Sequence, residues 1–214
     1  MIAIELRGIS KKFGGVTALD NVSFKLENGK TLGLVGGNGS GKTTLLNSIT
    51  RMVAPDRGEV YFRGERIDRL PAYGIARLGI GRIFQIGGVF KNMTVLENLL
   101  VASDGKRENE AERILKEVTL LEKKDKKAAT LSGGQQRLLE FGRVMVRNDE
   151  LILLDEPFAG VSAENSRKIE SVIKKLQKEG KTIILIEHDS ARIKRLCNQI
   201  IELEKGSIIR KAGG

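Results

Sequence analysis

GGNGSGKTT, at residues 36–44, is the stretch that decides the fold of this chain. It contains the pattern G-x-x-x-x-G-K-[ST], which runs from Gly36 through Gly41 and Lys42 to Thr43 and is typical of a loop that binds phosphate groups. Its glycines let the backbone approach a phosphate more closely than a Cβ atom would allow. Lys42 would reach the β- and γ-phosphates of a nucleoside triphosphate, and the Thr43 hydroxyl would bind Mg²⁺.

The residues on either side of this loop predict a strand before it and a helix after it. Residues 31–35, TLGLV, read as a short buried strand, and Leu45, Leu46, Ile49 and Met52 then recur at helical spacing. The N-terminus of such a helix offers free N–H groups and a positive dipole end to an anion. A glycine-rich turn without a ligand is the alternative, but it does not account for the complete pattern.

The composition limits the class of protein. A chain of 214 residues can bury a core and form one domain. The sequence has no run of about eighteen apolar residues, so it predicts no membrane span. Residues 1–13 are too polar for a signal peptide. The single cysteine, Cys197, excludes an internal disulfide, suits a reducing cytoplasm and is expected to pack in the core. The sequence contains no Cys/His cluster that would indicate zinc.

The net charge of +10 invites a nucleic-acid or membrane-surface interpretation. The basic residues are interleaved with acidic ones, and the densest basic cluster, residues 123–127, is short. We therefore interpret these charges as a solvated face, and we expect no direct contact with nucleic acid.

Strand-like and helix-like segments alternate along the chain, which favours an α/β fold with a mostly parallel sheet. The predicted strands are residues 22–27, 31–35, 59–62, 81–84, 151–154 and 181–186, and residues 199–203 and 207–210 predict a closing hairpin. The predicted helices are residues 73–78, 94–102, 108–121, 132–147 and 162–179. We expect one domain, 1–214, in which a helical subdomain, 86–145, is inserted between the two parts of the core, 1–85 and 146–214.

LILLDE, at residues 151–156, is an apolar run that ends in two carboxylates. A buried parallel strand holds its last residues at the sheet edge where α/β proteins bind ligands. Asp155 would lie near Mg²⁺, and Glu156 would be placed to polarise an attacking water. Alone this run could be a coincidence; together with the phosphate loop it indicates catalysis.

LSGGQ, at residues 131–135, would open a helix and so form a second N-terminus able to bind an anion. A plain helix cap by Ser132 is the alternative, and it is compatible with a ligand role. A second phosphate-binding terminus makes sense if two chains pair head to tail, each giving Ser132 to the other's nucleotide.

In this order the motifs resemble those of the nucleotide-binding subunit of an ABC transporter. Residues 36–44 match Walker A, Gln85 matches the Q-loop, residues 131–135 the signature and residues 151–156 Walker B. His188 matches the switch histidine, and Phe13 the aromatic that stacks on adenine. The resemblance implies a P-loop NTPase (RecA-like) core with a mostly parallel sheet, an N-terminal antiparallel β portion and the inserted helical subdomain.

The resemblance also implies a role for each matching residue. The ATP-binding set is Phe13, Gly36, Asn38, Gly39, Ser40, Gly41, Lys42, Thr43 and Thr44. The set that contacts the partner chain's ATP is Ser132, Gly133, Gly134 and Gln135. The Mg²⁺ set is Thr43, Gln85 and Asp155, and the catalytic set is Glu156, His188 and Gln85. A core aromatic at Phe13, a solvated turn glutamine at Gln85 and a structural histidine at His188 are the alternatives.

Two departures and one subgroup feature refine the resemblance. Ser162 stands where many members have aspartate, so the coupling between paired sites stays open, and Asp149 replaces a frequent proline. RIFQ, ending at Gln85, and residues 89–99 resemble the ATPases of branched-chain amino-acid and urea-type importers. Val89, Phe90 and Met93 would then line a groove for a membrane subunit, or else pack within the helical subdomain.

The resemblance implies an ATPase subunit of an importer at the cytoplasmic face of the membrane. Its partners would be a second ATPase chain, identical or paralogous, transmembrane permease subunits and an extracytoplasmic solute-binding protein. The solute would be selected by those other subunits. A soluble ABC ATPase acting on nucleic acid and a non-hydrolysing regulatory subunit are the alternatives.

Overall fold

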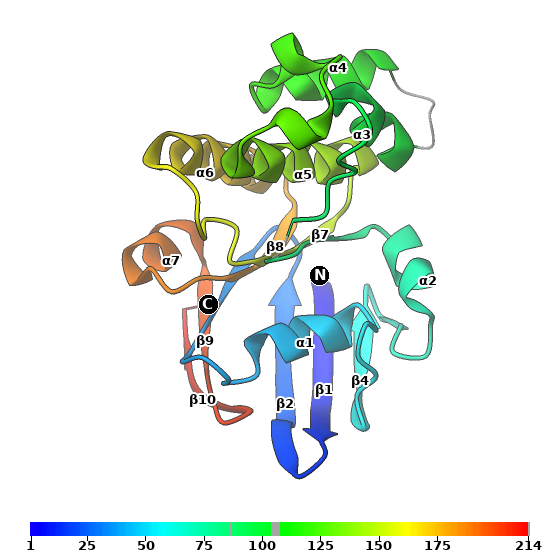
Figure 1. Cartoon of the computed structure of the whole chain (residues 1–214). Coiled ribbons are helices and arrows are strands. Elements are labelled where there is room, and N and C mark those ends of the chain that lie inside the picture. Colours follow the sequence, from blue (N-terminus) through cyan, green and yellow to red (C-terminus); the bar gives the residue numbers. More distant parts are fainter. Residues whose placement is uncertain (86, 104–107, 214) are drawn as a thin grey trace.

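The fold is built on two β-sheets in the computed structural model, which describes residues 1–85, 87–103 and 108–213 (Figure 1). The larger sheet is parallel except for its last strand. In spatial order its strands are β10 (Ser207–Ala212), β9 (Gln199–Glu204), β3 (Thr31–Val35), β8 (Thr182–Ile186), β7 (Leu151–Asp155) and β6 (Ile80–Ile83). The smaller sheet is antiparallel, in the order β2 (Val16–Glu27), β1 (Ile2–Phe13), β4 (Arg57–Phe62) and β5 (Glu65–Arg66). The predicted α/β fold with an N-terminal antiparallel portion is confirmed.

The central strands of the parallel sheet form because nearly all of their side chains are apolar. Every residue of β7 and β8 is buried, as expected for strands that are covered on both faces. β7 extends one residue beyond the predicted run and ends at Asp155. The carboxylate of Asp155 therefore lies at the carboxyl edge of the sheet, where the sequence placed it.

The antiparallel sheet contains more strand residues than the sequence indicated. β1 was not assigned, and β2 begins at Val16 rather than at residue 22. The alternation of buried and exposed residues in both strands is interrupted by register shifts, and Asn21 has a positive φ of 50°. These irregularities break the simple period of two on which the prediction relied.

Seven α-helices lie within the described residues. They are α1 (Lys42–Ile49), α2 (Ala72–Arg77), α3 (Val95–Ala102), α4 (Glu108–Glu117), α5 (Gly133–Arg147), α6 (Ala163–Lys178) and α7 (Ser190–Leu196), with short 3₁₀ turns at Leu121–Lys123 and Ala128–Thr130. Helix α4 ends before residue 121 because Thr119 has a left-handed φ of 59°. Helix α7 was missed; Asp189 caps it by accepting hydrogen bonds from the amides of Ala191 and Arg192.

Helix α1 is shorter than its apolar spacing indicated. It ends at Ile49, and Arg51 then turns the chain with a φ of 57°. Met52, predicted to lie on the apolar face of the helix, is instead 57% exposed. Leu45, Leu46 and Ile49 are fully buried in a cluster that joins α1 to both sheets. This packing fixes the phosphate loop, which precedes α1, at the carboxyl end of β3.

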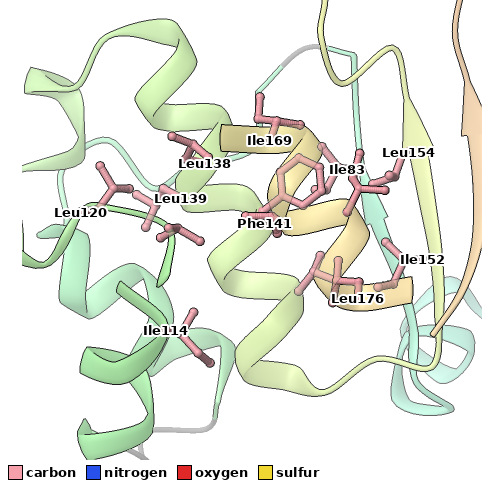
Figure 2. Packing of buried hydrophobic residues seen from close by; sticks show 14 of the residues in the cluster. Ile83, Ile114, Leu120, Leu138, Leu139, Phe141, Ile152, Leu154, Ile169 and Leu176 are labelled. Carbon is pink, nitrogen blue, oxygen red and sulfur yellow. The ribbon is translucent and has the colours of Figure 1, made fainter. Parts of the chain in front are cut away.

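Helix α5 joins the helical segment to the parallel sheet (Figure 1). Phe141 is fully buried between side chains of α6, β6 and β7, while Leu138 and Leu139 belong to the same cluster (Figure 2). Helices α3 and α4 pack against α5 and contribute further residues to this cluster. Residue 86, the predicted start of the helical subdomain, lies outside the described residues, and the subdomain boundaries stay a prediction.

Cys197 packs against the same core cluster, as predicted. Burial raises the pKa of its thiol to about 12. Within the described part of the chain, no helix combines the length and the apolar character needed to cross a membrane.

Replacement of Phe141 by alanine should lower the free energy of unfolding by about 3–5 kcal/mol, because it leaves a cavity where α5 meets the sheet. Val101→Ala, at a position on α3 that is 48% exposed, is the matched control and should change it by less than about 0.5 kcal/mol. Urea denaturation measures both values. Equal effects of the two substitutions would mean that Phe141 does not anchor this contact.

Candidate active site

The phosphate loop is the turn between β3 and α1. Gly41 has a φ of 104°, and a Cβ atom there would collide with the carbonyl oxygen of Ala18. Gly37 and Gly39 face open space instead. Helix α1 has no side-chain cap at its N-terminus, so its first turn can offer N–H groups to an anion.

Lys42 is held inside the curve of this loop. Its Nζ donates hydrogen bonds of 2.8 Å to the carbonyl oxygens of both Gly36 and Gly37, and it lies 3.4 Å from the Ser40 hydroxyl. Burial lowers the pKa of Lys42, and the negative charges of Glu156 and Asp155 oppose that shift. The ammonium group is thus near both carboxylates that end Walker B.

Asp155 links the phosphate loop to the end of β7. The Thr43 hydroxyl lies 3.3 Å from Oδ1 of Asp155, in hydrogen-bond contact. An aspartate and a threonine oxygen at this spacing are the hard ligands that Mg²⁺ takes beside substrate phosphates. These residues fit the predicted metal ion. Oδ2 of Asp155 is bound by a residue to which the sequence assigned no role, Arg82, at 3.1 Å.

The carboxylate of Glu156 contacts the side chains of the two other predicted catalytic residues. The Gln85 side-chain amide donates to Oε2 of Glu156 at 3.0 Å, and Nε2 of His188 lies 2.9 Å from Oε1. Glu156 has a φ of 49°, a left-handed value that is rare for a residue with a side chain and is often found at functional sites. Its amide donates to the carbonyl oxygen of Ile186, which ties the ends of β7 and β8 together.

Two buried charged residues of α5 hold the segment that carries Gln85. Arg137 donates to the carbonyl oxygens of Phe84 and Gln85, the latter at 2.7 Å, and forms a 2.8 Å ion pair with Glu140. Glu140 in turn accepts from the amide of Gly88. Sequence reasoning missed both residues, although two charges on the buried face of an amphipathic helix were a usable signal.

Glu187 was also missed. Its buried carboxylate accepts hydrogen bonds from the amides of His188, at 3.2 Å, and Phe158, at 3.4 Å. Burial raises the pKa of Glu187, against the nearby positive charge of Arg192. This carboxylate connects the loop that follows Glu156 to the loop that carries His188.

Phe13 lies at the end of β1 and is 48% exposed, so it is not the core aromatic of the alternative interpretation. The hairpin that carries it runs directly into β2, where the carbonyl group of Ala18 lies against Gly41 of the phosphate loop. An exposed aromatic ring on a hairpin that borders this loop is suited to stacking on a base.

The signature residues open α5. The Ser132 hydroxyl accepts from the amide of Gln135 at 3.4 Å, and the Gln135 side chain accepts from the amide of Ser132 at 3.1 Å. A Cβ atom on Gly134 would collide with the side chain of Asn165, whereas Gly133 faces open space. No hydrogen bond or ion pair among the described residues joins this set to residues 36–44. The structure does not bring the signature onto the phosphate loop of its own chain.

A cavity of about 340 Å³ lies beside the Gln85 segment, between α2, β6 and α5. Its lining includes Ile75, Phe84, Arg143 and Asp149, but not Val89, Phe90 or Met93. Of these three predicted groove residues, Val89 packs against the core cluster, and Phe90 is 42% exposed with the Arg143 guanidinium 4.7 Å from its ring.

Known proteins resemble this chain in sequence and in fold. Residues 19–159 match the ABC transporter family. The chain belongs to this family. It is 35% identical to the high-affinity branched-chain amino acid transport ATP-binding protein BraF of Pseudomonas aeruginosa, over 95% of this chain and 89% of that protein. It is 37% identical to the probable branched-chain amino acid transport ATP-binding protein LivG of Archaeoglobus fulgidus, over 98% and 88%.

Solved ABC cassettes have the same fold. The ADP conformation of MJ1267, an ATP-binding cassette of an ABC transporter, superimposes with a TM-score of 0.91 at 33% identity and covers all of this chain and 92% of that one. A dimeric, post-hydrolysis state of the cassette MJ0796 bound to ADP and phosphate gives 0.88 at 29% identity, with 98% of each chain covered. This chain is therefore an ABC-type ATPase.

Replacement of Phe13 by alanine should weaken ATP binding to this ABC cassette by about 1–3 kcal/mol, the usual contribution of an aromatic ring stacked on a base. Phe90→Ala removes a ring of similar exposure, 42% against 48%, and should leave the affinity unchanged. Fluorescence titration with a labelled ATP measures both. An unchanged affinity of the Phe13 variant would exclude stacking.

Proposed function

We propose that this chain hydrolyses ATP as one of two paired cassettes that drive an importer at the cytoplasmic face of a membrane. The observation that carries the proposal is the meeting of three side chains from three separate loops, in which Gln85 and His188 both contact the carboxylate of Glu156. Lys42 and Asp155 lie close to the same point.

Nucleotide binding would use the loop and the exposed hairpin. Phe13 stacks on the adenine, and the backbone of residues 36–44 surrounds the phosphates. Lys42 exchanges the carbonyl groups of Gly36 and Gly37 for phosphate oxygens, because a charged acceptor gives the stronger hydrogen bond. Thr43, Asp155 and Gln85 would hold Mg²⁺, which neutralises negative charge on the phosphate oxygens.

Hydrolysis would use Glu156 as the base. Its carboxylate would accept a hydrogen bond from the attacking water and take up the proton as the oxygen bonds to the γ-phosphorus, while the bond from that phosphorus to the β–γ bridging oxygen breaks and ADP leaves. Gln85 and His188 hold that carboxylate in place, and His188 also reaches the γ-phosphate. The presence of all these side chains weighs against a non-hydrolysing subunit.

Two chains would form each complete site. Ser132, Gly133, Gly134 and Gln135 of one chain contact the ATP held by the other chain's Lys42. The free space at Gly133 supports this arrangement. Glycine is generally a poorer helix former than alanine, and among the described residues no contact at Gly133 requires the absence of a side chain. The dimeric MJ0796 cassettes are a precedent for pairing of related chains. The second chain is identical or a paralogue.

The transport role rests on the relatives and on the cavity. Both BraF and LivG are named as branched-chain amino acid transport ATP-binding proteins, so we assign this chain to importers of that solute class. Permease subunits dock in the cavity between α2 and α5. Phe84 lines this cavity and directly precedes Gln85, so a subunit bound there would be coupled to Gln85 through the backbone. Residues 86–145 serve as the helical subdomain, and an extracytoplasmic binding protein delivers the solute.

Glu156→Gln should retain ATP binding but lower turnover by about 10²–10⁴-fold, because the amide can keep its contacts with Gln85 and His188 but cannot accept the proton. Glu150→Gln, just before the same strand and half-exposed, is the matched control and should retain turnover. Phosphate release measures turnover of the purified chain.

The same variant tests the transport role. In proteoliposomes that contain the permease subunits that co-purify from native membranes, leucine uptake should fall in parallel with turnover. Uptake that persists would separate this chain from transport.

Ser132→Arg should leave ATP binding by the single chain intact and prevent ATP-dependent pairing, because the long side chain blocks the N-terminus of α5. When Ser132→Arg chains are mixed with Lys42→Ala chains, each mixed dimer has one intact composite site and one with both defects. Pairing on a sizing column and some turnover should then return. Normal pairing and hydrolysis by Ser132→Arg alone would exclude the head-to-tail arrangement.

A further inference from the structure

Arg82 connects three elements at the floor of the nucleotide site. It lies on β6 opposite Leu153 of β7, and its side chain is only 5% exposed. One guanidinium nitrogen, Nη1, donates to Asn47 at 2.6 Å and to the Thr50 hydroxyl at 3.2 Å, both at the end of α1. The other, Nη2, donates to Oδ2 of Asp155 at 3.1 Å.

Arg82 and Thr43 each contact a different carboxylate oxygen of Asp155. Oδ2 faces the guanidinium, and Oδ1 faces the Thr43 hydroxyl, where a metal ion would bind. The Asp155 side chain is 2% exposed, so water screens this pair weakly. A guanidinium keeps its charge under all ordinary conditions.

The structural contacts of Arg82 do not by themselves require its charge. Its neighbours Ile80 and Ile83 on the same strand are buried and apolar. Burial of an ion pair is costly, and an apolar residue at such a position is often as stable. Nε of Arg82 is moreover buried without a hydrogen-bond partner, which adds to the cost. A charge kept at this expense beside Asp155 suggests a role that depends on charge.

The charges that meet at the site cancel. Lys42 and Arg82 are cationic, and Asp155 and Glu156 are anionic. Lys42 is within electrostatic range of both carboxylates, and Arg82 contacts one of them. Loss of the Arg82 charge would leave a net negative site, which would attract a metal cation and repel the phosphates of ATP.

We infer that Arg82 is the resident counter-ion of Asp155: it keeps the metal position from binding a divalent cation before ATP arrives, and it contributes positive charge toward the phosphates. Arg82 acts through Asp155 and is therefore a positioning residue. The inference rests on the proposed function only in taking Asp155 and Thr43 as the metal position.

Charge removal should thus shift two affinities in opposite directions. In Arg82→Gln the amide can still donate to Asp155, but the charge is lost. Mn²⁺ should bind the nucleotide-free variant about tenfold more tightly than the unsubstituted chain, and ATP in the presence of EDTA should bind about tenfold more weakly. Electron paramagnetic resonance of free Mn²⁺ and calorimetric titration of ATP measure the two affinities.

Arg66→Gln is the matched control. Arg66 lies on β5 of the smaller sheet, where it forms an ion pair of 3.0 Å with Asp68 and another with Glu59, and neither carboxylate belongs to the nucleotide site. Both affinities should stay within twofold of the unsubstituted chain. A parallel loss of both affinities in Arg82→Gln, or no change in either, would overturn the inference, because a structural role moves them together.

Arg82→Lys carries the test if the glutamine variant does not fold. It keeps the charge and loses the planar fork, so both affinities should stay within threefold. A tenfold change in either would show that Arg82 supplies geometry rather than charge and would overturn the inference. Neither measurement uses turnover, so the outcome is independent of whether Glu156 catalyses hydrolysis. Failure of the unsubstituted chain to bind ATP would instead refute the proposed function.

Discussion

The parallel pairing of β3, β8 and β7 is the constraint on which the whole site depends. These strands are almost entirely apolar and can be satisfied only when both faces of the sheet are covered. Because they run in the same direction, the residues that follow them meet at one edge. The phosphate loop follows β3, Asp155 ends β7 and His188 comes two residues after β8. The site is thus a consequence of how the hydrophobic core is built.

The residues that could be predicted from the sequence are those whose role is encoded locally. Lys42, Ser132 and Asp155 stand in short contiguous motifs, and the structure places each at the end of the expected element. Errors arose where local periodicity was a poor guide. Met52 continued an apolar spacing that the left-handed turn at Arg51 had already ended.

The residues that could not be predicted pair with partners far along the chain. Arg82 contacts Asp155 across 73 positions, and Arg137 contacts the Gln85 carbonyl across 52. Both are arginines that a sequence reader assigns to solvent, since charged residues are rarely buried without a partner. Their burial becomes visible only when the fold supplies that partner. Buried charged residues such as Arg82 and Arg137 are therefore the positions where the structure adds functional candidates that local sequence patterns do not indicate.

Helix α5 brings these separate features into one mechanical element. Its N-terminus carries the signature, Arg137 and Glu140 hold the backbone beside Gln85, and Arg147 at its last residue pairs with Asp149 at the cavity. Fifteen helical residues span about 22 Å, and close packing at Phe141 leaves them little freedom to bend. A tilt imposed at either end must then displace the carbonyl groups that Arg137 holds, and with them the side chain that contacts Glu156. In the proposed assembly, a partner chain at the signature and a permease subunit in the cavity would therefore act on the same carboxylate, that of Glu156.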